Sequence, residues 1–313
     1  MQQNEKPTTP VDRPLDSDLP GSNGTAAIAS PPTLPSLVKR YAQNAYFLAK
    51  ETTKAIALRP AYAAYERRLT AKAATWQLPR HIALVMDGNR RFARLTGLGE
   101  LRLGHERGAE KVFELLGWCY ELRIPVVTLW GFSLDNFQRV ETEVSSLMEI
   151  IERKTRELHR HPSVHRNRVR IRFIGRLDLL PASLRSAIRE VEAVTAGYGD
   201  FLVNLAIAYS GREEIADACR RYLEEQVRSG ASLEEAAASF TDDTISRYLY
   251  TSGQPEPDLI VRTSGEVRLS GFLLWQGAQS EYYFCDAYWP AFRKIDFLRA
   301  LRAYHFRQRR FGR

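Results

Sequence analysis

The sequence predicts an α/β fold, in which a central and mostly parallel sheet is flanked by helices. From residue 79 onward, short apolar runs alternate with longer stretches of helical periodicity. Each apolar run ends at a glycine or a small polar residue, as strands that feed into loops and helices do. The chain has 313 residues, 44% of them hydrophobic, which suffices for one sizeable core with extensions.

The expected elements alternate along the chain. The apolar runs predict strands at residues 81–86, 123–132, 168–175, 200–209, 257–263 and 281–289. The periodic stretches predict helices at Glu106–Glu121, Glu141–Arg160, Ala182–Thr195, Glu213–Ser229 and Asp296–Arg307. Because parallel strands need crossover connections, we expect these helices to cover both faces of the sheet.

The residues before the sheet predict two different segments. Residues 1–36 are rich in Pro, Ser, Thr, Gly and Asn, which predicts a disordered tail. Residues 37–77 mix aromatic, aliphatic and basic side chains, which predicts a helical arm in two pieces broken at Pro60. The arm is expected to pack on the main domain, 78–313, or on a second subunit, with a membrane surface as the alternative.

Composition limits the functional classes. The net charge is +8, and residues 293–313 hold eight basic side chains against one acidic one. Such a block suits nucleic acid, anionic lipid, a phosphorylated substrate or simply solvent. Three widely spaced cysteines without a C-x-x-C pair argue against a disulfide framework or a Cys-based zinc site. With no apolar run of about 20 residues and no signal-peptide pattern, we expect a cytoplasmic protein.

The first motif follows the first expected strand and contains Asp87, Gly88 and several arginines. In open α/β sheets, ligands bind outside the carboxyl ends of the strands. Asp87 ends the strand, Gly88 allows a close backbone approach, and a helix opens next with Arg90, Arg91 and Arg94. This combination predicts Mg²⁺ bridging to a diphosphate. The alternative, an Asp cap with a solvated basic turn, is disfavoured by the helix dipole.

Three further strand ends carry polar residues. Arg262, Arg268 and Ser270 surround a Ser-Gly turn and could clamp one phosphate group, although a surface hairpin is the alternative. Glu281 begins an aromatic strand as a cap or a second metal ligand. The loop containing Ser133 and Asn136 is unremarkable by itself. His159, His161 and His165 lack a nearby carboxylate or cysteine, which favours a solvated turn over a metal site.

Five blocks, taken together and in order, resemble the cis-prenyltransferases, the undecaprenyl diphosphate synthase family. The resemblance runs from about Leu78 to Arg313 and rests on the following sequences: H-I-A-L-V-M-D-G-N-R-R-F-A-R, G-H-E-R-G-A, F-S-L-D-N-F-x-R, R-T-S-G-E-x-R-L-S-x-F-L-L-W-Q and S-E-Y-Y-F-x-D-x-x-W-P-x-F. Five ordered blocks are far more specific than any one of them.

The resemblance implies the family's α/β fold, a homodimer and a Mg²⁺-dependent transferase. This enzyme would condense isopentenyl diphosphate with an allylic diphosphate, geranyl or farnesyl, to form a Z double bond. The implied catalytic residues are Asp87, Ser133, Asn136 and His105, and the implied metal ligands are Asp87 and Glu281, the latter possible across the dimer. The implied substrate-binding residues are Gly88, Asn89, Arg90, Arg91, Phe92, Phe137, Arg139, Arg262, Arg268, Ser270, Arg310 and Gly312.

Several positions depart from the family pattern. Asp135 stands where many members have Glu, Phe92 replaces a common Trp, and Gly271 replaces a common Asn. The basic residue expected just before G-H is displaced, with Leu101 in its place and Arg102 one position later. None of these changes removes the central acid or the arginine pair, so they bear on substrate fit and product length.

Product length and three alternatives stay open at this level. Gly131 lines the family's product tunnel and leaves room, which predicts a medium to long polyprenyl chain. Residues 250–258 and 268–272 instead resemble actinobacterial members, some of which stop at Z,E-farnesyl diphosphate. A non-catalytic subunit of a heteromeric enzyme would have lost Asp87 and its arginines, and Ser133 with Asn136 argues against irregular coupling of two allylic substrates. Nucleic-acid binding is not expected, because aromatic-basic surface motifs are missing.

Overall fold

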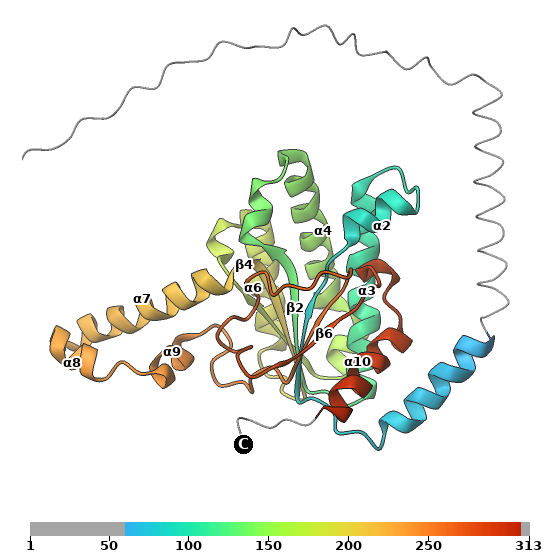
Figure 1. Ribbon diagram of the computed structural model, residues 1–313. Helices are drawn as coiled ribbons and strands as arrows, with labels where there is room; N and C mark the ends of the chain where they lie inside the picture. Colours follow the sequence, from blue (N-terminus) through green and yellow to red (C-terminus); the bar gives the residue numbers. More distant parts are fainter. Residues whose placement is uncertain (1–59, 308–313) are drawn as a thin grey trace, which may run out of the picture. The chain divides into compact units, whose positions relative to one another are not determined.

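The computed structural model describes residues 60–307, in which six strands form one sheet (Figure 1). The strand order is β3-β4-β2-β1-β5-β6, and every neighbouring pair is parallel. The strands are β1 (His81–Val85), β2 (Val126–Ser133), β3 (Val169–Ile174), β4 (Phe201–Tyr209), β5 (Leu259–Arg262) and β6 (Glu281–Phe284). All six predicted strands are confirmed, and the α/β fold class with them.

The helices between the strands follow the predicted pattern with a few differences. They are α2 (Asn89–Leu95), α3 (Leu101–Glu121), α4 (Glu141–Arg160), α5 (Pro162–Arg166), α6 (Ala182–Thr195), α7 (Gly211–Ser229), α8 (Leu233–Ala238), α9 (Asp242–Tyr248) and α10 (Lys294–Phe306). The bounds of α4 and α6 are as predicted. Helix α3 begins five residues earlier than predicted. Gly104, inside it, serves close packing, since a Cβ there would lie 2.9 Å from Ala93 Cβ of α2.

The two faces of the sheet are covered differently, which corrects the expectation of helices on both faces. Alternate strand residues such as Ile82 and Leu84 pack in a large core with α3, α4, α6 and α10. The intervening residues, including Ala83 and Val85, pack against Phe272 and Leu273. That second covering comes from residues 249–280, which mostly form turns. Helix α7 leads away from the sheet, and α9 packs beside α7 as the chain returns (Figure 1).

A chain of buried polar groups fastens this turn segment to the sheet. His81 Nδ1 lies 2.7 Å from the Pro255 carbonyl oxygen, and His81 Nε2 lies 2.8 Å from Thr128 Oγ1. Asn204 donates to Thr128 Oγ1 at 3.0 Å and to Gln254 Oε1 at 2.7 Å. Because a carbonyl can only accept, His81 Nδ1 carries a proton and donates to Pro255. Strands β1, β2 and β4 are thus joined to the segment that leads into β5.

The described part of the N-terminal arm packs on the main domain. Residues 60–73 are helical, and Leu69 and Ala73 are buried against Ile295 and Leu298 of α10. This agrees with one of the expected placements of the arm. The tail at 1–36 and the arm up to residue 59 lie outside the described residues. Among residues 60–307, no helix is both long and apolar enough to cross a membrane.

The protonation of His81 makes stability depend on pH. Burial lowers its pKa to about 4 and outweighs the raising effects of the Pro255 carbonyl and Asp258. In the unfolded chain His81 takes up a proton near pH 6.5, whereas in the folded chain it stays neutral down to about pH 4. The free energy of unfolding that His81 contributes above pH 6.5 is therefore lost as the pH falls towards 4. As the pH falls from 7 to 5, we expect the titration of His81 to lower the free energy of unfolding by about 2 kcal/mol.

Urea unfolding of the wild type and of His81→Gln at pH 7 and pH 5 tests this expectation. The variant should be less stable at pH 7 and should lose less of its remaining stability on acidification. His105 and the carboxylates titrate in both proteins, so the difference between the two pH dependences isolates His81. Equal dependences would show that His81 does not take up the proton.

Candidate active site

Polar side chains from three neighbouring strand ends meet in one pocket of about 610 Å³. Asp87 follows β1, Ser133 ends β2 and Arg262 ends β5, so the parallel order of these strands brings them to the same edge. The pocket is lined by Val85, Met86, Asp87, Gly88, Asn89, Arg90, Arg91, Arg94, His105, Trp130, Gly131, Phe132, Ser133, Asp135, Asn136, Arg139, Leu147, Arg262, Glu266, Arg268 and Ser270.

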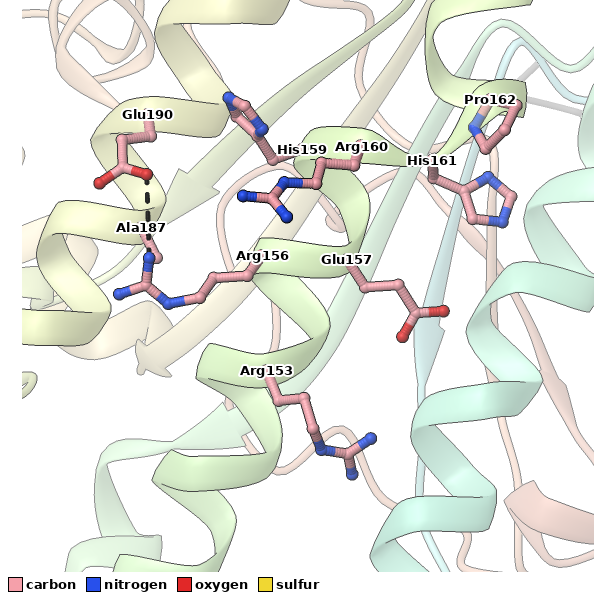
Figure 2. A pocket seen from close by; sticks show the side chains of 9 residues that line it. All are labelled: Arg153, Arg156, Glu157, His159, Arg160, His161, Pro162, Ala187 and Glu190. Carbon is pink, nitrogen blue, oxygen red and sulfur yellow. Dashed lines mark ion pairs between the residues drawn. The ribbon is translucent and has the colours of Figure 1, made fainter.

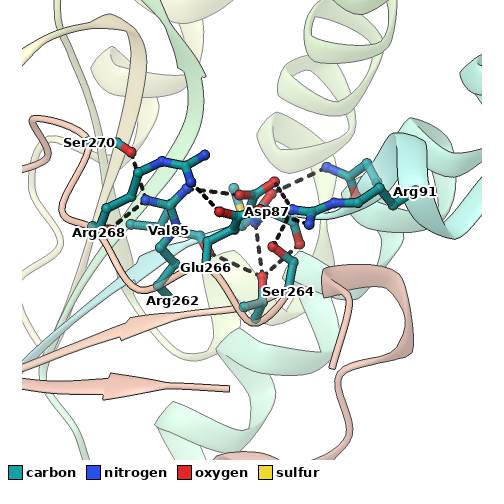
Figure 3. Close-up of polar contacts among 11 residues, drawn as sticks. Val85, Asp87, Arg91, Arg262, Ser264, Glu266, Arg268 and Ser270 are labelled. Carbon is teal, nitrogen blue, oxygen red and sulfur yellow. Dashed lines mark hydrogen bonds and ion pairs between the residues drawn. The ribbon is translucent and has the colours of Figure 1, made fainter. Parts of the chain in front are cut away.

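Asp87 lies at the centre of the polar contacts (Figure 3). Its Oδ2 accepts a hydrogen bond from Arg262 Nη2 at 2.9 Å, and its Oδ1 lies 3.5 Å from Arg91 Nη2. Partial burial acts to raise the pKa of Asp87. The Arg262 hydrogen bond and charge, the Arg91 charge and the Gly88 N–H together outweigh burial and lower the pKa below its usual value. Asp87 is therefore an ionised carboxylate that remains partly open to the pocket.

Gly88 turns the chain from β1 into α2 in a conformation that favours glycine. Its φ is 104°, and a Cβ there would lie 2.7 Å from Tyr288 Cδ1 and 3.0 Å from Ser264 Cβ. The first turn of α2 contains no acid and presents Arg90 and Arg91. The helix has only seven residues, so the arginines rather than the helix dipole supply most of the positive potential.

Arg262 is nearly buried, with 6% of its side chain exposed, and it links two segments. Besides Asp87, it donates through Nη1 to Ser270 Oγ at 2.7 Å and to the Arg268 carbonyl oxygen at 2.5 Å. The expected grouping of Arg262, Arg268 and Ser270 is therefore present in the structure. The guanidinium of Arg268 is exposed and instead pairs with Glu266.

The opposite wall of the pocket holds His105 and Arg139, and both lie next to Glu143, an acid that the motifs did not reveal and that does not itself line the pocket. Glu143 accepts from Arg139 at 2.9 Å and from Arg90 at 3.4 Å, and its carboxylate lies 3.7 Å from His105 Nε2. Burial, together with the charge of Arg139, lowers the pKa of His105 to about 4, although Glu143 acts to raise it. His105 is therefore neutral at pH 7.

Ser133 and Asn136 stand together where β2 runs into a short 3₁₀ helix (Leu134–Gln138). The Ser133 backbone N–H donates to Asn136 Oδ1 at 3.1 Å, which fixes the amide beside the strand end. The strand carries register shifts around Gly131, a bulge that re-aims the residues after it. Both side chains line the pocket with Asp87, as their predicted roles require.

Other predicted site residues are not brought into this pocket. Phe92 is half-buried on α2 and does not line it. Phe137 packs edge-to-face on Phe132 with ring centroids 4.9 Å apart, so it supports the wall from behind. Arg310 and Gly312 lie outside the described residues, and their roles stay predictions.

Glu281 lies at the other edge of the sheet from Asp87. It pairs with Leu259, which pairs with Ile82 near the start of β1, so about 16 Å of strand separates it from Asp87. Its carboxylate accepts from Arg307 at 2.8 Å. Within one chain, the two carboxylates therefore do not form a pair. The metal role of Glu281 stays a prediction for a contact across a dimer.

Sequence reasoning missed Glu266 and Trp130, which line the pocket, and Glu143, which pairs with two of the arginines that line it. Glu143 pairs with Arg90 and Glu266 with Arg91, both of the distant helix α2, and such pairings depend on which segments meet. A signal for Glu266 existed, because it stands between the two arginines of its motif. Trp130 stacks on Phe272 with ring centroids 5.1 Å apart and so holds the Arg268 loop against β2.

An apolar cavity of about 120 Å³ continues from the charged pocket, with which it shares Met86, Asn89, His105, Gly131 and Leu147. It lies between α3, α4 and the sheet. A further cavity of about 110 Å³ follows and shares Val112, Phe113, Leu158 and Leu205 with the first. The charged pocket thus leads into two apolar spaces in series.

A separate hollow of about 590 Å³ lies at the surface between α4 and α6 (Figure 2). Its arginines are partly neutralised: Arg153 contacts Glu106 at 3.3 Å, and Arg156 contacts Glu152 at 2.9 Å and Glu190 at 3.8 Å. The three histidines near it, for which a solvated turn was expected, make separate contacts: His161 stacks on Phe113, and His165 Nδ1 lies 3.0 Å from Tyr198 Oη. In the described part of the chain, no three His, Cys, Asp or Glu residues form a group that could hold a metal.

Comparisons with known proteins agree with this geometry. The family model for putative undecaprenyl diphosphate synthase matches residues 85–312. An isoprenyl transferase of Deinococcus radiodurans is 51% identical over 249 residues, which cover 79% of this chain and 90% of the relative. A (2Z,6E)-farnesyl diphosphate synthase of Thermobifida fusca is 53% identical over 253 residues, which cover 81% and 97%.

A solved structure supports the same grouping. Lavandulyl diphosphate synthase from Lavandula x intermedia, in complex with dimethylallyl diphosphate, matches with a TM-score of 0.69 and 32% identity. The match covers 75% of this chain and 99% of that chain. The region matched by the family model includes every residue of the pocket described above.

The conformation of Gly88 leads to a stability prediction. Gly88→Ala should lower the free energy of unfolding by about 2–4 kcal/mol, because an L residue is strained at this φ and its Cβ would meet Tyr288 and Ser264. Gly97 also has a positive φ, 67°, but open space around it, so Gly97→Ala should cost only about 1 kcal/mol. Urea unfolding of both variants measures the difference, and equal losses would show that packing at Gly88 is not tight.

Proposed function

The chain belongs to the undecaprenyl diphosphate synthase family of prenyltransferases, and on this premise we propose that it condenses isopentenyl diphosphate with an allylic diphosphate to form a Z-polyprenyl diphosphate. One observation carries the proposal. An ionised Asp87 and several arginines share one pocket, and that pocket shares five lining residues with an adjoining apolar cavity. Such a site fits a diphosphate head joined to a hydrocarbon tail.

The charged residues suit the bond changes of the reaction. The allylic C–O bond breaks with its electron pair leaving on the diphosphate, and the isopentenyl double bond supplies the electrons of the new C–C bond. Arg90 and Arg91 stand where the leaving diphosphate would gain charge, and donors already in place stabilise such charge without reorganisation. Arg262, Arg268 and Ser270 would hold the isopentenyl diphosphate on the facing side.

A proton must leave the isopentenyl unit to create the new double bond. Ser133 and Asn136 would orient this substrate beside the end of β2. His105 is neutral at pH 7, and its buried Nε2 has no hydrogen-bond partner in the described residues, so the ring can form a hydrogen bond with the substrate. We assign the proton-handling role to this group of three residues.

Mg²⁺ fits this site as a partner of the substrate. Mg²⁺ is commonly held by one or two carboxylates together with substrate phosphates. Asp87 is ionised and 31% of its side chain is exposed, so it would hold the ion together with diphosphate oxygens. The bound ion would neutralise part of the phosphate charge. If Glu281 is a second Mg²⁺ ligand, its carboxylate would have to come from a partner subunit.

Product length is the finer part of the proposal. Two apolar cavities in series, beginning at Gly131, support a medium to long chain. The relative named (2Z,6E)-farnesyl diphosphate synthase supports a short product as the second candidate. Phe113 lines both cavities and stacks on His161 with ring centroids 4.9 Å apart, so this side chain narrows the passage between them.

Assembly and location complete the proposal. Family membership supports a homodimer, in which the terminal Arg310 and Gly312 would reach the partner's phosphate site. Peripheral contact with an anionic membrane is supported by exposed Tyr62 and Phe306. The surface near Tyr62 is basic, with the Arg293 guanidinium 5.1 Å from the centre of its ring. Such contact would place the enzyme where a polyprenyl product is soluble.

Incubation with labelled isopentenyl diphosphate, geranyl or farnesyl diphosphate and Mg²⁺, followed by chromatography, tests the activity. Asp87→Asn should lower kcat by about a hundredfold or more, because it removes the central charge, while circular dichroism stays unchanged. Asp200→Asn, which breaks an exposed pair with Arg168, is the matched control and should keep full activity. No incorporation by the folded wild type would refute the proposal.

Substitutions along the cavities should change product length in opposite directions. Gly131→Leu should shorten the product, because even a Cβ at this position lies 2.9 Å from Ile207 Cδ1 and the larger side chain would narrow the entrance. Phe113→Ala should lengthen it by opening the passage to the second cavity. Product chromatography against polyprenyl standards measures both, with Phe113→Leu as a conservative control. An unchanged distribution in both variants would show that these cavities do not hold the growing chain.

A further inference from the structure

Glu266 lies in the pocket between two arginines from different segments (Figure 3). Its Oε1 accepts from Arg91 Nη1 of α2 at 2.8 Å, and its Oε2 accepts from Arg268 Nη1 of the loop after β5. In the function proposed above, Arg91 would bind the allylic diphosphate and Arg268 the isopentenyl diphosphate. The carboxylate of Glu266 therefore contacts one cation from each expected diphosphate site.

The position of Glu266 is built by the fold. Ser264 and Gly265 before it both have positive φ, 78° and 72°. Their backbone N–H groups donate to residues that follow β6, at 2.8 Å to the Ala287 carbonyl oxygen and 2.9 Å to that of Cys285. This anchored turn directs Glu266 back towards α2. Its place between the arginines therefore follows from the tertiary structure.

The contacts of Glu266 can be exchanged for those of a phosphate. Its side chain is 24% exposed, and the Arg268 side chain is 61% exposed, so solvent weakens both ion pairs. A phosphate offers more acceptor oxygens and more charge to the same guanidinium groups. Arg91 also donates to Ser264 Oγ at 2.7 Å and would stay oriented after Glu266 had left. Arg262 differs, because it is nearly buried and paired with Asp87.

We propose that Glu266 is a placeholder anion, which stands between Arg91 and Arg268 in the free enzyme where phosphate oxygens stand in the complex. It compensates the charges of Arg91 and Arg268 and keeps both side chains oriented. It also competes with each bound diphosphate for these two guanidinium groups. The same competition assists release of the product diphosphate. The proposal rests on the function proposed above.

Binding of inorganic pyrophosphate, measured by titration calorimetry with a chelator to exclude metal, tests the placeholder. Glu266→Gln should bind pyrophosphate about three- to tenfold more tightly than the wild type, since a competing anion is removed. Glu110→Gln is the matched control, because Glu110 pairs with Arg107 on the exposed face of α3 and does not line the pocket. It removes the same charge and should bind as the wild type does. Glu266→Asp keeps the charge but shortens the side chain that bridges the two arginines, so its affinity for pyrophosphate should lie between those of the wild type and Glu266→Gln.

Steady-state kinetics separate a placeholder from a structural role. In Glu266→Gln, KM for isopentenyl diphosphate should fall and inhibition by pyrophosphate should strengthen, each about three- to tenfold, while kcat does not rise. A merely structural residue would instead raise KM and lower kcat.

The outcomes also separate this proposal from the proposed function. Equal or weaker pyrophosphate binding by Glu266→Gln overturns the placeholder and leaves the diphosphate site standing. Absence of pyrophosphate binding in both the wild type and Glu266→Gln overturns the placeholder, and absence of binding also when Mg²⁺ is added overturns the proposed diphosphate site. If Glu266→Gln fails to fold, Glu266→Asp decides, and binding no tighter than that of the wild type overturns the placeholder.

Discussion

The ion pair between Asp87 and Arg262 is the contact on which the pocket depends. Arg262 is nearly buried, and a buried guanidinium is strongly destabilising unless its charge and its donors are satisfied. Asp87 provides the charge and accepts from Nη2, and Ser270 and the Arg268 carbonyl accept from Nη1, while the buried Nε has no hydrogen-bond partner in the described residues. One side chain therefore holds together the end of β1, the end of β5 and the loop after β5. The register of two parallel strands makes this contact possible, because it places Val85 beside Arg262.

The positive charge of the pocket is oriented by acids that leave part of it uncompensated. Each of three carboxylates contacts two arginines, so cations that would repel one another are held apart in defined positions. The acids are Asp87, Glu143 and Glu266, and the arginines are Arg90, Arg91, Arg139, Arg262 and Arg268. The excess of cations attracts a diphosphate, and the donors are in place before it arrives.

The covering of the sheet separates this charge from an apolar space. Helices α3 and α4 pack on one face of the sheet, and the cavities lie between them, reached through the bulge at Gly131. The turn segment on the other face carries Arg268, Ser270 and Glu266, and the stacking of Phe272 on Trp130 holds this segment against β2. An amphiphilic substrate therefore meets charge at the carboxyl edge of the sheet and hydrocarbon behind it.

The sequence by itself determined the six strands, the bounds of α4 and α6, and the gathering of Asp87, Ser133 and Arg262 at one edge. Hydrophobic periodicity is a local property, and parallel strands align their carboxyl ends whatever their order. Only the tertiary structure decided that Glu143 pairs with Arg90 and Glu266 with Arg91, that Phe137 packs on Phe132 behind the wall, and that Glu281 lies at the opposite edge. These outcomes depend on which loops meet and on strand register, and Arg91 and Glu266 are 175 residues apart in the chain. No local pattern records contacts of that separation.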